Sequence, residues 1–270
     1  MEQRAFGETG ITVPVVGMGT WKSFDVSTAA EEADRAVIVE RALAAGTTLF
    51  DTSPMYGESE RVLGAAVAHH RDHVIIADKV WTASAAEGRK QIERALEWYG
   101  GVVDIYQVHN LLNWQEHLPV LEDLKSRGAV RVVGATHYQH SAFPELMALM
   151  RTGRLDMIQI PYNAADRVVE REVLHLADEL NIGVLVMQPL GTGRLIRRAP
   201  SAQEMARLER FGVTTWAQAL LKWILSDTRV HCVIPATSKP ERAAENAVAG
   251  KAPWFDPDTR EYVARMLVQG

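Results

Sequence analysis

The chain has 270 residues, of which 47% are hydrophobic and 23% charged, with a formal net charge of −5. A chain of this length can bury a large core, either as one barrel or as two smaller domains. It has no basic block and no run of the roughly 18 to 20 apolar residues that span a bilayer. We therefore expect a cytoplasmic protein with neither nucleic acid nor a membrane as partner.

Cys232 is the only cysteine, which excludes an internal disulfide and a cysteine-cluster metal site. It lies in an apolar run, residues 230–234, where a packed core thiol is expected rather than a catalytic one. His69, His70 and His73 cluster around a predicted helix end, away from the strand tips, so the sequence predicts no metal site.

Short β-branched runs alternate with longer segments of helical apolar spacing, which is typical of a parallel sheet with crossover helices. The predicted strands lie near Val15–Met18, Thr47–Phe50, His73–Ala77, Val103–Val108, Val130–Gly134, Met157–Ile160, Gly183–Met187 and Val230–Ile234. The predicted helices lie near Glu32–Ala45, Glu60–Ala68, Ala86–Tyr99, Glu116–Lys125, Phe143–Arg151, Glu170–Leu180 and Thr215–Leu225, with a last helix from Pro240. Eight such units predict an α/β fold, a (β/α)8 TIM barrel, as a single domain over residues 1–270.

Residues 4–13 precede the first strand and indicate two short extended pieces around a turn. They are too short to join an eightfold cycle, so we expect an N-terminal β-hairpin that closes the barrel floor. The alternative fold is a Rossmann sheet, in which a Gly-x-Gly-x-x-Gly turn follows the first strand. Residues 17–22 (GMGTWK) break that pattern and favour the barrel.

Polar residues follow three successive predicted strands, at the end of the barrel where such folds carry their chemistry. Asp51 ends the second strand and Tyr56 lies in the turn after it, while Lys79 follows the third strand. His109 follows the fourth. Taken singly, each has an ordinary explanation, such as a turn former, an exposed lysine, a rim aromatic or a core histidine.

Together these four residues suit carbonyl reduction, in which the alkoxide formed by hydride addition must be protonated. We expect Tyr56 to be the proton donor, although a free phenol has a pKa of about 10. Lys79 is expected to lower the pKa of Tyr56, and Asp51 to keep Lys79 charged and oriented. His109 is expected to donate a hydrogen bond to the substrate oxygen.

The sequence resembles the aldo-keto reductase superfamily from Arg4 to about Asn246, with three motifs in the family's order. Residues 4–21 resemble its opening hairpin and first strand, residues 50–57 (FDTSPMYG) its Asp-to-Tyr signature, and residues 234–246 its closing cofactor motif. The resemblance implies the four roles above, and an NADPH or NADH cofactor that lies across the barrel mouth and transfers its pro-R hydride.

The resemblance also implies a set of cofactor contacts at the strand ends and in the loops after them. They are Gly19, Thr20, Trp21, Asp51, Thr136, His137, Gln159, Met187, Gln188, Pro189, Leu190, Gly191, Gly193, Ala236, Thr237, Ser238, Lys239, Arg242, Glu245 and Asn246. Thr136 and His137 replace the Ser-Asn that often holds the nicotinamide carboxamide, and Met187 replaces an aromatic ring. The turn at 191–193 is expected to offer backbone N–H groups to the pyrophosphate.

NADPH is the favoured cofactor, because Arg242 can make bidentate contacts to a 2′-phosphate. NADH is the alternative, since Ala236 stands where many NADPH-preferring members carry a lysine. A small carbonyl substrate is expected in a pocket lined by Trp21, Met55, Trp81 and Asn110.

Two further questions stay open at this point. The unusual Thr136, His137 and Met187 leave the alternative of a cofactor-binding accessory or sensor subunit on the same barrel, with slow chemistry. The sequence is compatible with a monomer or a small homo-oligomer. A metal-dependent barrel hydrolase is disfavoured because no convincing ligand set is present.

Overall fold

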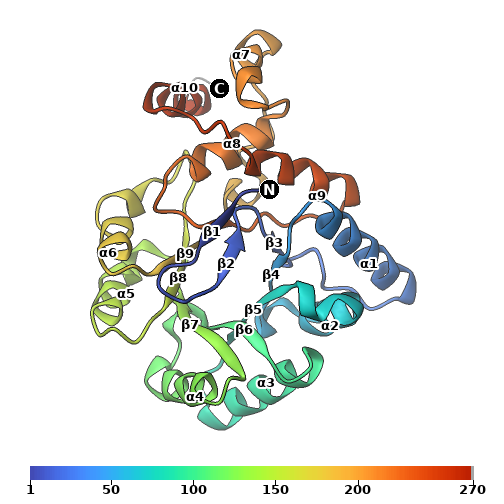
Figure 1. Ribbon diagram of the computed structural model, residues 1–270, viewed down its shortest axis with the longest axis vertical. Coiled ribbons are helices and arrows are strands. Elements are labelled where there is room, and N and C mark those ends of the chain that lie inside the picture. Colours follow the sequence, from blue (N-terminus) through green and yellow to red (C-terminus); the bar gives the residue numbers. More distant parts are fainter. Residues whose placement is uncertain (269–270) are drawn as a thin grey trace.

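An eight-stranded parallel sheet forms the centre of the fold in a computed structural model, which describes residues 1–268 (Figure 1). Its strands are β3 (Met18–Gly19), β4 (Leu49–Asp51), β5 (Ile75–Val80), β6 (Val103–Val108), β7 (Val130–Thr136), β8 (Met157–Pro161), β9 (Gly183–Met187) and β10 (Cys232–Val233). Each strand pairs with the next along the chain, and isolated parallel bridges, Val16 with Val233 and Gly19 with Ala236, join the two ends. The predicted (β/α)8 TIM barrel is confirmed.

The eight strands lie where the β-branched runs predict them, and β6 and β9 have the predicted bounds. β3 and β10 are shorter than predicted, because the segments beside them meet only through the isolated bridges. β5 is longer at its carboxyl end, where Val80 pairs with Val108. Lys79 therefore lies within a strand instead of following one.

Helices surround the barrel on its outer side (Figure 1). Those that correspond to predicted helices are α1 (Ala29–Ala44), α2 (Ser59–Val67), α3 (Ala85–Trp98), α4 (Trp114–Ser126), α5 (Phe143–Met150), α6 (Val173–Glu179), α8 (Trp216–Leu225) and α9 (Pro240–Ala247). Thr28 before α1 and Thr215 before α8 form capping boxes, which satisfy backbone donors that a helix start leaves unpaired. No helix within residues 1–268 has the length and apolar character needed to cross a membrane.

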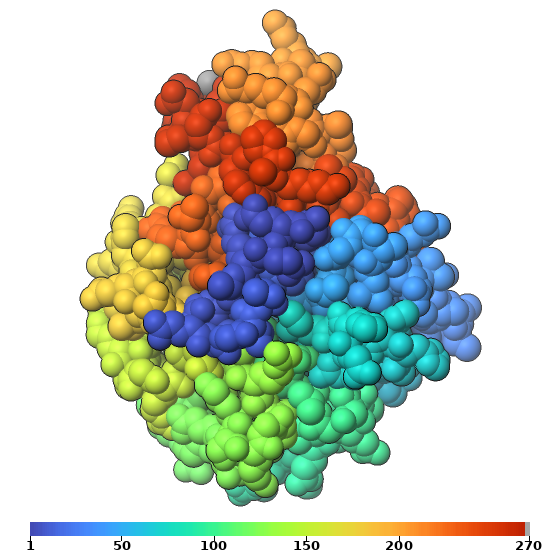
Figure 2. Space-filling model, viewed as in Figure 1, coloured from blue at the N-terminus to red at the C-terminus, as the bar shows by residue number. Residues whose placement is uncertain are grey.

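Two helices have no counterpart in the sequence prediction, α7 (Ala202–Ala206) and α10 (Pro257–Val268). They lie together in an extension of the barrel at the top of Figures 1 and 2, where the Tyr262 hydroxyl donates to the Glu204 carbonyl at 3.2 Å. α7 has no buried residue, which explains why an apolar pattern does not reveal it.

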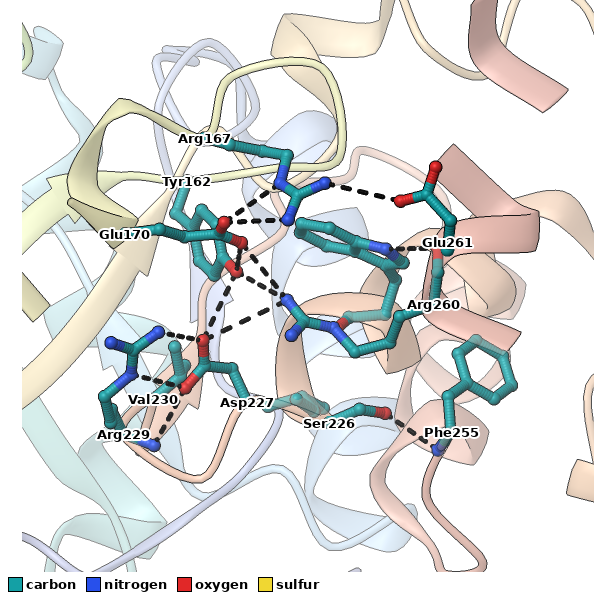
Figure 3. A network of polar contacts seen from close by, with 12 residues as sticks. Tyr162, Arg167, Glu170, Ser226, Asp227, Arg229, Val230, Phe255, Arg260 and Glu261 are labelled. Atoms are coloured by element: carbon teal, nitrogen blue, oxygen red, sulfur yellow. Dashed lines mark hydrogen bonds and ion pairs between the residues drawn. The ribbon is translucent and has the colours of Figure 1, made fainter. Parts of the chain in front are cut away.

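A network of charged groups anchors α10 to the barrel (Figure 3). Arg260 of α10 donates to the Tyr162 hydroxyl at 2.6 Å and lies 3.4 Å from a Glu170 carboxylate oxygen. A carboxylate oxygen of Asp227 is 4.0 Å from the same guanidinium. Burial raises the pKa of Tyr162, so this phenol stays neutral and both donates and accepts within the network. These polar contacts supplement the burial of Val263 in holding the helix.

The N-terminal hairpin, β1 (Gln3–Ala5) and β2 (Thr12–Pro14), closes one end of the barrel as predicted (Figure 1). Phe6 and Val13 are fully buried in a cluster with inward-facing residues from the strands. The Phe6 ring packs on Gly183, where a Cβ atom would lie 2.8 Å from the ring. The absence of a side chain at position 183 therefore allows the ring to seal the floor.

Replacing Phe6 with alanine should lower the free energy of unfolding by about 3 to 5 kcal/mol, because it leaves a cavity beneath the strands. Urea unfolding followed by circular dichroism measures the change. Val37→Ala on α1, where the side chain is 48% exposed, is the control and should cost less than about 0.5 kcal/mol. Equal losses in the two variants would show that the hairpin does not seal the core.

Candidate active site

A buried ion pair lies at the mouth of the barrel. Lys79 Nζ is 2.8 Å from each carboxylate oxygen of Asp51, and it donates to the Thr52 carbonyl at 2.6 Å. Lys79 is fully buried and Asp51 nearly so. Burial is the largest single influence and lowers the pKa of Lys79, but the charges of Asp51, Tyr56 and Asp78 and the hydrogen bond to Asp51 together outweigh it, so the pKa is raised. Lys79 therefore remains an ammonium group at neutral pH.

Tyr56 lies over this pair, in the turn after β4. The Lys79 ammonium is 5.2 Å from the centroid of the Tyr56 ring. Burial raises the pKa of Tyr56 and the charge of Lys79 opposes the rise, with a net increase. Lys79 lowers the pKa of Tyr56, as expected, but desolvation of the phenolate outweighs this attraction, so the pKa stays above its ordinary value. Tyr56 is thus a neutral phenol that carries a proton.

His109 stands beside Tyr56 in an edge-to-face contact, with ring centroids 5.9 Å apart. Burial and the charge of Lys79 lower the pKa of His109 to about 2, so the imidazole is neutral. Its Nδ1 atom lies 2.8 Å from the Ser53 hydroxyl oxygen. A hydroxyl, a neutral imidazole and an ammonium group therefore meet at one place, as the sequence predicts.

Two glutamines complete the polar interior. Gln159 Nε2 donates to Asp51 at 2.7 Å and lies 3.3 Å from Gln107 Oε1. Gln107 Nε2 is 3.5 Å from the same Asp51 oxygen. Sequence reasoning missed Gln107 and Ser53. Gln107 lies two residues before His109, and side chains two residues apart along a strand share a face. This spacing in the sequence could have placed Gln107 on the inward face of the barrel.

A pair of buried carboxyl groups, Asp78 and Glu60, lies behind Lys79. Neighbouring strand residues face opposite sides of a sheet, so Asp78 faces the helices when Lys79 faces the interior. Asp78 is fully buried, Glu60 of α2 nearly so, and Asp78 accepts the Lys79 backbone N–H at 2.7 Å. Burial raises the pKa of both carboxyls, and the charge of Asp78 raises that of Glu60 further. The pair therefore retains a proton at neutral pH.

The predicted carboxamide contacts come together at the ends of two neighbouring strands. Thr136 of β7 pairs with Gln159 of β8 in the sheet register. His137 follows directly and is half-buried, and its Nδ1 accepts the Gln139 backbone N–H at 3.0 Å. That contact leaves Nε2–H as the donor of the ring. Met187 ends the adjacent strand β9 and is half-buried.

The loop after β9 contradicts one expectation. The N–H of Gly191 donates to the Gln188 carbonyl at 2.9 Å, and that of Gly193 to the Leu190 carbonyl at 3.0 Å. The prediction that these two groups are offered to a pyrophosphate is therefore wrong. The reason is that the turn closes into a short 3-10 helix, η6 (Gly191–Gly193), which uses them internally.

The closing motif leads into α9, whose N-terminal end carries two unpaired basic side chains. Thr237 accepts the Lys239 backbone N–H at 3.1 Å and orders the approach to the helix. Lys239 and Arg242 are exposed, and within residues 1–268 neither forms an ion pair. Ala236 is exposed beside them and Asn246 is buried. The two cations are thus available to a phosphate group, which the start of a helix also favours.

The predicted substrate residues follow four neighbouring strands. Trp21, Met55 and Trp81 are 39%, 36% and 39% exposed, respectively. Asn110 adopts a left-handed backbone conformation with φ 55° and donates its N–H to Thr136 Oγ1 at 3.2 Å. Large apolar side chains that are exposed to solvent beside polar groups are typical of a ligand-binding surface.

The remaining residues lie outside the mouth. Cys232 is buried in the core, as expected, and Trp216 of α8 is buried as well. Trp114 is half-buried at the start of α4 and donates to Glu145 at 2.9 Å. Among the described residues there is no group of three or more His, Cys, Asp or Glu side chains arranged to hold a metal ion.

An ammonium, a phenol and an imidazole thus lie together at the mouth of a (β/α)8 barrel, which is the arrangement that the resemblance to aldo-keto reductases implies. Residues 15–266 match the Aldo/keto reductase family, and the chain belongs to that family. It is 26% identical over 311 residues to the NADH-specific methylglyoxal reductase of Escherichia coli, covering 92% of this chain and 93% of that protein.

Other relatives support the same assignment. The chain is 27% identical over 281 residues to L-galactose dehydrogenase of Arabidopsis thaliana, with 92% of this chain and 88% of that protein covered. Its fold is similar to the crystal structure of an aldo/keto reductase from Klebsiella pneumoniae in complex with NADP and acetate. The TM-score is 0.81 at 24% identity, covering 97% and 93% of the two chains.

Replacing Asp78 with asparagine should make stability less dependent on pH. The folded carboxyl pair has raised pKa values and keeps a proton that the unfolded chain releases above a pH of about 4. The stabilisation is complete below that pH and is lost as the pH rises through the raised values. The wild-type free energy of unfolding should fall by up to about 1.4 kcal/mol per pH unit for each proton released.

Urea unfolding between about pH 5 and pH 9 measures this slope. Asp78→Asn should show a shallower fall than the wild type. Glu116→Gln, at an exposed carboxyl of α4, is the control and should keep the wild-type slope. Parallel curves for wild type and Asp78→Asn would contradict the retained proton.

Proposed function

We propose that the protein reduces an aldehyde or ketone to an alcohol, with a nicotinamide dinucleotide as hydride donor and Tyr56 as proton donor. The observation that carries the proposal is the buried pair of Lys79 and Asp51 beneath the Tyr56 ring. A permanent ammonium group at this place stabilises the phenolate that proton transfer leaves behind. Membership of the family supports the same class of reaction.

Each side chain has a separate part in the proposed reaction. His109 donates a hydrogen bond from Nε2 to the carbonyl oxygen and orients it. When bound, a nicotinamide dinucleotide would supply the hydride that adds to the carbonyl carbon. Tyr56 gives its hydroxyl proton to the carbonyl oxygen, and Lys79 stabilises the phenolate until a proton returns from solvent. Asp51 keeps Lys79 oriented throughout.

The strand ends fit a nicotinamide cofactor. Thr136, His137 and Gln159 offer hydrogen-bonding groups to its carboxamide, and Met187 covers the ring. The remaining proposed contacts are Gly19, Thr20, Trp21, Asp51, residues 188–190, residues 236–239, Glu245 and Asn246. The unpaired Lys239 and Arg242 support NADPH over NADH, while the name of the Escherichia coli relative keeps NADH as the alternative.

The substrate is proposed to be a small carbonyl compound. Trp21, Met55 and Trp81 provide exposed apolar surface, and Asn110 provides a polar edge beside His109. Two relatives from Escherichia coli are named methylglyoxal reductases, which makes methylglyoxal the first substrate to test.

Tyr56→Phe should lower kcat for methylglyoxal about 1,000-fold and leave cofactor affinity near normal, because only the transferred proton is removed. NADPH oxidation followed by absorbance, together with fluorescence titration of the cofactor, measures the two quantities. Tyr138→Phe, at an exposed tyrosine beside the mouth, is the matched control and should retain the wild-type rate. Full activity of Tyr56→Phe would exclude Tyr56 as the donor.

The same assay separates an enzyme from an accessory or sensor subunit. Wild-type turnover of about 1 per second or faster with any aldehyde, ketone or quinone supports the enzyme. Tight cofactor binding without turnover supports the alternative, which the unusual Met187 and His137 motivate.

Arg242→Ala should raise the KM for NADPH by about 10-fold or more and leave the KM for NADH within about twofold, because a charged contact to the 2′-phosphate is lost. Initial rates with each cofactor provide the measurement. Arg89→Ala, at an exposed arginine of α3, should change neither constant. An equal rise for both cofactors would place Arg242 elsewhere than at the 2′-phosphate.

A further inference from the structure

Ser53 connects the two groups that face the substrate. It caps the short 3-10 helix η1 (Pro54–Tyr56), and its hydroxyl oxygen accepts the Met55 backbone N–H at 3.2 Å. Its carbonyl oxygen accepts the Tyr56 N–H at 2.9 Å. The same hydroxyl lies 2.8 Å from His109 Nδ1, and Ser53 has no exposed surface. Solvent therefore does not compete for this contact.

The proton inventory decides the direction of this hydrogen bond. A serine hydroxyl has one proton to donate, and a neutral imidazole carries one proton on one of its two nitrogens. The Ser53 oxygen already accepts from Met55, and among residues 1–268 its hydroxyl has no acceptor within reach other than His109 Nδ1. A buried hydroxyl left without an acceptor is destabilising, so Ser53 donates to Nδ1.

We propose that Ser53 is a positioning residue that holds His109 in the tautomer with its proton on Nε2. Only this tautomer donates a hydrogen bond to a carbonyl oxygen. The other tautomer presents a lone pair to that oxygen and repels it. The consequence for turnover rests on the proposed carbonyl reduction, whereas the tautomer itself does not.

NMR of the protein labelled with 15N-histidine observes the tautomer directly and without turnover, because the 15N shift separates protonated from unprotonated ring nitrogens. His109→Ala identifies the His109 signals. Wild type and Ser53→Thr, which keeps the hydroxyl, should show a proton on Nε2 alone. Ser53→Ala should show a mixture of tautomers. A proton on Nδ1 in the wild type, or an unchanged Ser53→Ala spectrum, overturns the proposal.

Turnover of methylglyoxal with NADPH tests the consequence. Ser53→Ala should lower kcat about 10-fold with KM within about twofold, and Ser53→Thr should restore kcat. In the His109→Ala background the serine change should cost nothing more, because Ser53 acts through His109. A loss of kcat that persists in the His109→Ala background would show that Ser53 acts by holding the turn that carries Tyr56, and it would overturn the proposal. Absence of wild-type turnover rejects the proposed function alone, since the NMR result still stands.

Discussion

The buried charge of Lys79 is the constraint on which the barrel mouth depends. An ammonium group without exposed surface is tolerated only when paired and hydrogen-bonded, because burial of an isolated charge costs many kcal/mol. Asp51 provides the counter-charge and Thr52 a further acceptor. Asp51 in turn takes hydrogen bonds from Gln159 and Gln107, so the ion pair fixes the inward-facing polar residues of four strands.

The end of the barrel opposite the polar mouth is apolar. Phe6 and Val13 pack against inward-facing strand residues such as Leu185, which fills the interior below the ion pair. The apolar end of the barrel stabilises the fold, and the polar end positions the charged groups. A low-dielectric layer beneath Lys79 also strengthens its attraction for a phenolate at Tyr56, because fewer waters screen the charge.

The sequence predicts what depends on order along the chain. Strand periodicity located β4, β5 and β6, and polar residues at their carboxyl ends identified Asp51, Lys79 and His109, because parallel strands bring these ends together. It does not predict contacts set by side-chain direction across the barrel, such as Gln107 to Asp51 or Ser53 to His109. Nor does it reveal that the Gly191 N–H is used within its own turn. It also does not show that burial raises the pKa of Tyr56 by more than the charge of Lys79 lowers it.

The two faces of β5 are linked through charge. Lys79 and Asp78 are neighbours on opposite faces, and the negative charges of Asp51 and Asp78 both raise the pKa of Tyr56. A proton retained by Asp78 and Glu60 reduces the negative charge behind Lys79. Loss of that proton would make phenolate formation harder and would also destabilise the folded state, because two buried anions would repel each other. The outer carboxyl pair therefore couples the stability of the barrel to the electrostatics of its mouth.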